Sequence, residues 1–468
     1  MRSSSQPVSA HRLAAGSKSS GSHPKRKPSA ICRRLFLICL LLFTFHFSLS
    51  YTAYTKELIL GDLVEEALKN SPELLVSETK VAASGYRIPQ AKSLPDPMFM
   101  FGYQNEGFRR FTLGDEPDAM GMFSLSQMFL FPGKRALKGE MATKDMESLK
   151  DMYKATQLKV IATVKQLYYE LFLANKSIDI LKETTEFFSR IEDAASARYS
   201  SGMGSQQEVV MAQTEKYMLI EKETMQKQKI ETVTGMLNTT IGRDASSPLG
   251  RPVDPPQTPY AFSLEELIRK AKKDSPEIRS REKMVEAADA KVKMAQKEYY
   301  PDFTIGANYY PRTKGLTDMA SLTATINIPI FYKTKQDQAV LEAKANQLGA
   351  KRELASTEYM LSSAIRENYS MAQTGEKLMT LYKEGVSPKI RHGKIEAITA
   401  ISRLKALLDT ELLFWGQYVE REKAIARLDA LTGGGSSEFP VLRSGRVATA
   451  EGGGVLSSEK SGTGGTSQ

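Results

Sequence analysis

Four short segments of the chain alternate apolar and polar residues. They are residues 98–104, 122–130, 303–310 and 322–328. In the third segment Phe303, Ile305 and Tyr309 alternate with smaller or polar residues, and a period of two is typical of a β-strand with one apolar and one polar face. Segments of this kind and length also occur in outer-membrane β-barrels. A half-buried sheet in a soluble protein is the alternative that the alternation alone leaves open.

Two much longer segments have the periodicity of helices. Residues 140–201 contain no Gly or Pro and place apolar residues three or four positions apart. At 1.5 Å per residue this helix would be about 93 Å long. Residues 334–384 form a similar stretch, broken only by two glycines. Each stretch ends at a Tyr-x-x-Gly turn, and each is followed by a returning helix, predicted over 206–241 and 389–431.

The predicted elements occur twice in the same order. Asn70-Ser-Pro-Glu-Leu in the first half returns as Asp274-Ser-Pro-Glu-Ile in the second. Ser before Pro-Glu is typical of a helix start. The serine hydroxyl can accept a hydrogen bond from a free backbone N–H, and proline has no backbone N–H that would need an acceptor. Each half is therefore predicted to contain a helix, two strands, a very long helix, a turn and a helix that ends at a glycine C-cap.

This repeat divides the chain into five parts. The first repeat covers 56–247, a Pro-rich linker covers 248–260, and the second repeat covers 261–433. The Gly- and Ser-rich tail, 434–468, is predicted to be disordered. Residues 1–53 are predicted to be an export signal, with a basic stretch followed by an apolar run that is too short to span a bilayer.

Composition and charge narrow the class of protein. Charged residues make up 25% of the chain and hydrophobic residues 41%, which excludes a polytopic helical membrane protein. The formal net charge is +10, but residues 1–50 hold eight Lys or Arg and no acid. The rest of the chain is nearly neutral, so we expect no nucleic-acid partner.

The chain lacks the residues that most catalytic and metal sites need. Both cysteines and all histidines except His392 lie in the predicted signal. Without them the mature protein cannot form a thiolate zinc site, a Cys-His dyad or a disulfide. We expect no catalytic residues, no bound metal and no cofactor; an exported hydrolase is the alternative that this shortage disfavours.

Four strands cannot form a closed barrel. An open sheet has two unpaired edges, which a bilayer does not tolerate, and the smallest membrane barrels have about eight strands. If the strands cross a membrane, two or three copies of the chain must therefore share one barrel. The long helices would then project from its rim into the periplasm.

The doubled plan resembles the TolC-like outer-membrane efflux protein family from about residue 58 to residue 433. The residues that carry the resemblance are Asn70-Ser-Pro-Glu, Ala91-Lys-Ser-Leu-Pro-Asp-Pro, Phe131-Pro-Gly-Lys-Arg and the paired Tyr-x-x-Gly turns. The Phe131–Arg135 element is most similar to the heavy-metal-efflux branch. Single motifs of this kind are weak, and their order, twice over, is the specific feature.

The resemblance implies a fold, a location and partners. The fold is α+β, with long helices in a periplasmic helical barrel and four strands per chain in a β-barrel shared by a homotrimer. The protein would be a passive exit duct in the outer membrane, where lipid surrounds it. Its partners would be a periplasmic adaptor protein and an inner-membrane pump. Metal ions are the cargo that the resemblance suggests. A duct for organic compounds or type I protein secretion, and a periplasmic coiled-coil adaptor or scaffold without a barrel, are the alternatives.

The resemblance also implies two functional zones at the helix turns. The adaptor-docking tips are predicted at Tyr199, Gly202, Met203 and Gly204 in the first repeat and at Tyr382, Gly385 and Val386 in the second. Some relatives carry an aspartate ring just after the second turn, where this chain has Arg391 and Lys394. A periplasmic gate is therefore predicted from Glu208 against Arg391 or Lys394, the alternative being a solvated basic face.

Two predictions concern the strands and the corner after them. If the aromatic residues of 98–104 and 122–130 face lipid, then four thioethers line the pore, those of Met98, Met100, Met122 and Met128. Thioethers favour soft ions such as Cu(I), while plain packing is the alternative reading. At the corner, Lys134 and Arg135 are predicted to reach lipid phosphates or core polysaccharide.

Overall fold

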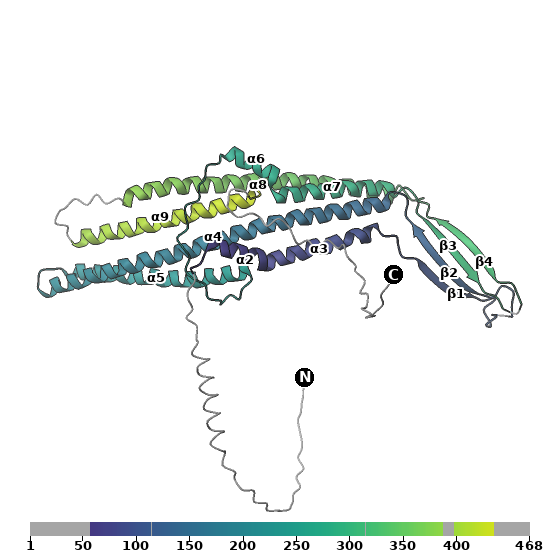
Figure 1. The fold of residues 1–468 in the computed structure, drawn as a ribbon, viewed down its shortest axis with the longest axis horizontal. Helices are drawn as coiled ribbons and strands as arrows, with labels where there is room; N and C mark the ends of the chain where they lie inside the picture. Colours follow the sequence, from purple (N-terminus) through teal and green to yellow (C-terminus); the bar gives the residue numbers. More distant parts are fainter. Residues whose placement is uncertain (1–56, 114, 314, 387–396, 435–468) are drawn as a thin grey trace, which may run out of the picture. The chain divides into compact units, whose positions relative to one another are not determined.

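The computed structural model describes residues 57–113, 115–313, 315–386 and 397–434. Within these residues eight helices and four strands follow one another in an order that occurs twice (Figure 1). The first half runs α2 (Leu60–Asn70), α3 (Pro72–Lys92), β1 (Met98–Gln104), β2 (Met120–Phe129), α4 (Lys134–Ser200) and α5 (Gln206–Ile241). The second half runs α6 (Leu264–Asp274), α7 (Pro276–Lys297), β3 (Phe303–Tyr310), β4 (Met319–Ile326), α8 (Gln336–Val386) and α9 (Ala397–Leu431).

The observed elements agree closely with the alternating and helical patterns. β1, β3 and α5 have the predicted bounds, whereas β2 and β4 begin two and three residues earlier than predicted. The long helix α4 has 67 residues and begins at Lys134 rather than at 140. At 1.5 Å per residue it is about 100 Å long. The predicted α+β fold class with an internal repeat is confirmed.

The Ser-Pro motifs start helices, but not by the predicted capping bond. α3 begins at Pro72 and α7 at Pro276, directly after Ser71 and Ser275. Neither serine hydroxyl makes a capping hydrogen bond, and both serines are buried. Instead Ser71 N–H donates to Ala67 O at the end of α2. The capping prediction was wrong: each serine follows the preceding helix directly and continues its hydrogen bonding, with its N–H donating to a carbonyl in the last turn of that helix, Ala67 O or Ala271 O.

The helices of the two repeats pack against each other. α4 packs against α3 and α5 of its own repeat and against α7 and α9 of the second, while α8 packs against α7 and α9 (Figure 1). One cluster of buried residues joins α4 to α9 through Tyr169, Phe172, Tyr418 and Val419. The core is therefore continuous between the halves rather than divided at the linker.

The four strands form one antiparallel sheet in the order β1-β2-β3-β4 (Figure 1). The central pair, β2 and β3, joins the repeats, with Phe123 opposite Tyr309 and Phe129 opposite Phe303. β1 pairs only with β2 and β4 only with β3. The sheet of the described chain is thus open at both edges.

Several predicted segments lie outside the described residues. They are the export signal 1–53, the gate residues Arg391 and Lys394, and the tail from residue 435. Among the residues that are described, no helix combines the length and the apolar character needed to cross a membrane.

Candidate functional site

The backbone register of the sheet separates the side chains onto two faces. Because directly paired residues lie on the same face, each cross-strand pair assigns its members together. One face carries aromatic and aliphatic side chains, among them Phe99, Phe101, Phe123, Leu125, Phe303, Ile305, Leu322 and Ile326. The opposite face carries Met98, Met100, Met122, Ser124, Ser126, Met128, Thr304, Asn308, Ser321, Thr323 and Thr325.

In the central strands β2 and β3 the apolar face is the more exposed of the two, whereas in β1 and β4 both faces are exposed. Along β3 the apolar positions Phe303, Ile305 and Tyr309 are exposed, while Thr304, Gly306 and Asn308 between them are partly or fully buried. In β2, Phe123 and Leu125 are likewise exposed. In water, the hydrophobic effect would instead bury the apolar face and leave the polar face exposed. A sheet whose apolar side faces outward is suited to contact with lipid, as in outer-membrane barrels.

A buried cluster fixes the corner between the sheet and the helices. Lys134, only 1% exposed, places its Nζ 3.0 Å from an Asp302 carboxylate oxygen and 3.2 Å from a Glu298 carboxylate oxygen. It also donates to Tyr300 O, 3.0 Å away. Phe131 stacks on Tyr300 with the ring centroids 4.5 Å apart. The prediction that Lys134 reaches lipid or polysaccharide was wrong, because acids of the second repeat surround its ammonium group.

The first-repeat tip, between α4 and α5, is a tight turn. Gly202 has φ of 73°, and Met203 N–H donates to Arg198 O at 2.9 Å. A Cβ added to Gly204 would lie 2.9 Å from Arg198 Cβ. Tyr199 and Met203 are exposed, Met203 by 73%. Glycine is thus required here both for the left-handed backbone and for the close approach of the two helix ends.

The second-repeat tip is described only as far as residue 386. Tyr382, Gly385 and Val386 lie in the last turns of α8, as helix rather than as a turn. The reversal that was predicted at Gly385 falls outside the described residues. The two predicted tips can therefore be compared only on their α4 and α8 sides.

Glu208, the predicted gate acid, lies in the first turn of α5. Its Oε2 is 3.8 Å from an Arg198 guanidinium nitrogen, and its side chain is 16% exposed. The same oxygen is buried and has no hydrogen-bond partner within the described part of the chain. The pairing with Arg391 or Lys394 falls outside that part and stays a prediction.

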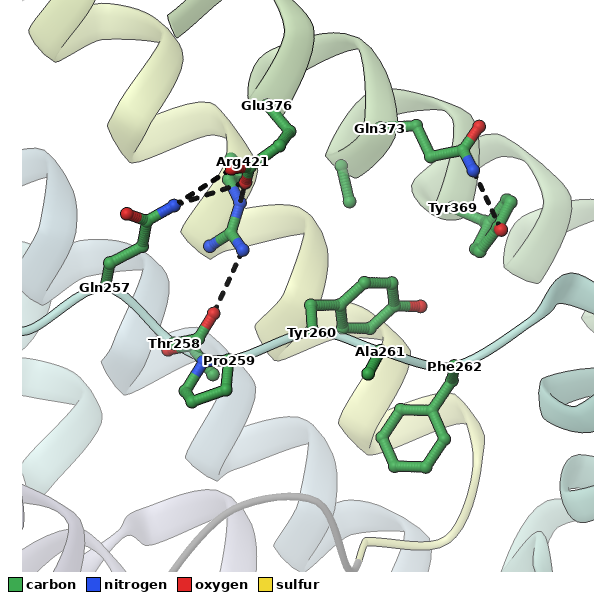
Figure 2. Close-up of a pocket in the computed structure, with 11 residues that line it drawn as sticks. Gln257, Thr258, Pro259, Tyr260, Ala261, Phe262, Tyr369, Gln373, Glu376 and Arg421 are labelled. Atoms are coloured by element: carbon green, nitrogen blue, oxygen red, sulfur yellow. Dashed lines mark hydrogen bonds and ion pairs between the residues drawn. The ribbon is translucent and has the colours of Figure 1, made fainter. Parts of the chain in front are cut away.

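A groove that the sequence did not suggest lies where the inter-repeat linker crosses α8 and α9 (Figure 2). Its volume is about 580 Å³, and its lining includes Tyr260, Phe262 and Tyr369. Arg421 donates to Thr258 O at 3.0 Å and pairs with Glu376 and the buried Glu422. Two carboxylates already neutralise its charge. The polar groups of the groove therefore bind the linker to the helices.

Burial perturbs the titration of groups around this linker. It raises the pKa of Glu422 above the usual value, against the effect of hydrogen bonds from Thr258 and of Arg421. Burial also raises the pKa of Tyr168 to about 12. The Tyr168 hydroxyl donates to Leu58 O and to Val253 O. The only sequence signal for these contacts is the tandem Tyr168-Tyr169 in an otherwise regular helix. This pair of tyrosines does not indicate which residues their hydroxyls bind.

Within the described residues, no three His, Cys, Asp or Glu side chains are grouped so as to hold a metal ion. The described features are those of a membrane-facing sheet joined to long paired helices. Together they define the class of helical outer-membrane proteins with a small β-sheet per chain.

The chain belongs to the outer membrane efflux protein family, whose model matches residues 63–228 and 267–389. The predicted membership and the predicted outer-membrane location are thereby confirmed. Two curated relatives are 22% identical: the nickel-cobalt-cadmium resistance protein NccC of Alcaligenes xylosoxydans xylosoxydans over 296 residues and Protein CyaE of Bordetella pertussis over 291 residues. The matches cover 61% and 59% of this chain and 64% and 60% of those proteins, less than two thirds of their length.

Solved outer-membrane channels have the same fold. The open state of MtrE of Neisseria gonorrhoeae aligns with a TM-score of 0.65 at 16% identity, over 81% of this chain and 89% of MtrE. VceC of Vibrio cholerae aligns with a TM-score of 0.62 at 17% identity, over 81% and 97%. CusC aligns with a TM-score of 0.63 at 14% identity, over 82% and 94%.

Proposed function

We propose that three copies of this chain form a passive exit duct through the outer membrane, as one component of a tripartite efflux system. The observation that carries the proposal is the sheet itself, with its apolar face outward and its two edges open. Four strands from each of three copies would close a barrel and leave no backbone group unpaired in lipid. The polar face would then line the lumen, and the duct performs no catalysis.

The proposed partners act at the opposite end of the long helices. The exposed turn around Tyr199 and Met203 is a compact surface for a periplasmic adaptor that binds an inner-membrane pump. Tyr382, Gly385 and Val386 are proposed as the matching tip of the second repeat. Glu208, with Arg391 and Lys394, is proposed to form the constriction next to these tips.

The proposed cargo is metal ions. It is supported by the NccC relative, whose name states nickel, cobalt and cadmium resistance, and by the similarity of the Phe131–Arg135 element to the heavy-metal-efflux branch. A duct for organic compounds or for type I protein secretion is the alternative function.

The proposal is tested on the purified full chain. We expect a heat-sensitive trimer in detergent gels, fractionation with the outer membrane, and single channels in a planar bilayer. Replacing Leu322 on the outward apolar face by Lys should abolish membrane assembly, because a charge in the lipid-facing band costs about 2–4 kcal/mol. Thr323→Lys, one residue further on and on the opposite face, is the matched control and should assemble. A soluble periplasmic monomer with no channel activity would contradict the duct and favour the adaptor reading.

A further inference from the structure

Methionine is concentrated on the face of the sheet where an apolar residue is least expected. The register pairs Met98 with Ser126 and Met100 with Ser124, while Met122 lies opposite Gly102. Met128 lies opposite Thr304. All four thioethers therefore share a face with hydroxyl and amide side chains. Apart from Tyr310, the aromatic and branched aliphatic side chains of the four strands lie on the other face.

These methionines do not pack in a core. Met98 is 62% exposed and Met100 is 52% exposed. Their direct partners in β2 are serines, which are too small to cover them, and none of the four belongs to a buried apolar cluster of the described residues. The packing explanation for methionine on a strand therefore does not apply at Met98 and Met100, whereas Met122 and Met128 are partly buried.

The register also places the methionines in two diagonal pairs between β1 and β2. Met98 lies diagonal to Met128, and Met100 lies diagonal to Met122. Diagonal neighbours in an antiparallel pair have Cα atoms about 7–8 Å apart, within reach of long side chains. Methionine has three rotatable side-chain bonds, so two thioethers can approach one ion without a change in the backbone.

We propose that Met98, Met100, Met122 and Met128 form a contact path for the soft monovalent cations Cu(I) and Ag(I) on the polar face of the sheet. Thioether sulfur prefers Cu(I) to harder ions, whereas Ni²⁺ and Co²⁺ are better held by nitrogen and oxygen ligands. The inference rests on the proposed function, because it makes this face the lumen of the duct. It also selects among cargoes, since it favours soft monovalent ions.

The chemistry suits transit rather than storage. Thioethers are neutral and carry no proton to lose, so they contact a cation without fixing it by charge. A conduction path needs sites that favour entry but release the ion to the next site. The two methionine pairs on β1 and β2 supply two successive sites with the same thioether ligands.

Ag(I) binding to the purified full-length chain tests the inference directly. Cys32 and Cys39 lie in the predicted export signal, and both are replaced by Ser so that any uncleaved protein brings no thiol to the titration. The test variant is M98L/M100L/M122L/M128L, and the matched control is M218L/M225L/M236L, which changes exposed methionines of α5. We expect the test variant to lose at least about tenfold in Ag(I) affinity, because changing even the groups that support metal ligands costs about 10–100-fold. The control should bind as the parent does.

X-ray absorption at the silver edge should show sulfur neighbours in the parent and their loss in the test variant. Equal Ag(I) affinity and equal sulfur coordination in the parent and the test variant would overturn the inference. Because leucine is close to methionine in size and both face the same surroundings, folding is checked in each protein by the heat-sensitive gel mobility.

Single-channel recording separates this inference from the proposed duct. In nitrate salts, micromolar Ag(I) should reduce the current through the parent and the control but not through the test variant. Channels that respond equally to Ag(I) in parent and test variant would refute the ion path and leave the duct intact. A parent chain that binds Ag(I) but forms no channel would instead refute the duct, and with it the assignment of this face as a lumen.

Discussion

Gly242 lies directly against the backbone of Asn70, so closely that a Cβ added to the glycine would be 2.4 Å from Asn70 O. The second repeat has the same contact, in which a Cβ on Gly433 would be 2.5 Å from Asp274 O. Both glycines have left-handed backbones, with φ of 84° and 86°. Each therefore caps the last helix of its repeat and lets that helix end against the residue that precedes the Ser-Pro motif.

Gly242→Ala should destabilise the protein by about 2–4 kcal/mol, because it adds left-handed strain to a collision with backbone. The thermal midpoint of the detergent-solubilised protein, followed by circular dichroism, measures the loss. Gly85→Ala is the control, since Gly85 is in the middle of α3 with open space around it. That substitution should stabilise the protein by about 0.5–1 kcal/mol. Similar effects of both changes would show that the contact with Asn70 is not tight.

Lys134→Met should cost about 3–5 kcal/mol, because it leaves the largely buried carboxylate of Asp302 without its cation; Glu298, which also loses this partner, is 43% exposed. The measurement is again the thermal midpoint. Arg135→Met is the matched control, because the neighbouring Arg135 is exposed, and it should change stability by less than about 0.5 kcal/mol. If the two variants lost equal stability, the corner would not depend on the ion pair.

Tyr168→Phe should weaken the attachment of α4 to Leu58 and to Val253 of the linker. The hydroxyl lies 3.1 Å from Leu58 O and 2.9 Å from Val253 O, and removing it takes this donor from both carbonyls. Leu58 O keeps the Val253 N–H as a donor, so the expected loss is that of an ordinary hydrogen bond, about 0.5–1.5 kcal/mol. Hydrogen exchange should also increase at Leu58 and Val253. Tyr86→Phe, at an exposed tyrosine of α3, should alter neither quantity.

Glu422→Gln should change how stability depends on pH. Because burial raises the pKa of Glu422, the folded protein binds a proton at a pH where the unfolded chain, with a Glu pKa of about 4.3, does not. The wild type therefore gains stability as the pH falls through the folded pKa, and the gain is complete below the unfolded pKa.

The difference in thermal midpoint between wild type and Glu422→Gln is the measurement. It should move in favour of the wild type between pH 7 and about pH 4.5. The control is Glu367→Gln, at an exposed position of α8, and it should show no such trend. A difference that is constant with pH, or that moves in favour of the variant in acid, would contradict the assignment to Glu422.

Local pattern was sufficient for the elements themselves. The bounds of β1, β3 and α5 follow from alternation, from helical periodicity and from the glycine that ends α5, all of which act within a few residues. The starts of β2 and β4 were placed too late. In β2 the first residues, Met120 and Gly121, do not alternate, and pairing with Gln104 and Tyr103 brings them into the strand.

The partners of charged residues could not be predicted in the same way. Lys134 follows an exposed-looking Pro-Gly corner, and nothing near it in the sequence indicates burial. Asp302 and Glu298, which neutralise it, are in the other repeat and come close only when β2 pairs with β3. The linker groove depends on folding for the same reason, since Arg421 meets Thr258 from a distant part of the chain.

The sequence by itself determined the doubled order of helices and strands, the alternation within each strand, and the family, because these depend on local periodicity and on short motifs. Only the tertiary structure decided which residues meet. A strand has two faces whatever its partners, but cross-strand register selects the neighbours on each face. That register gathered Met98, Met100, Met122 and Met128 with serine and threonine, and turned the apolar side chains outward.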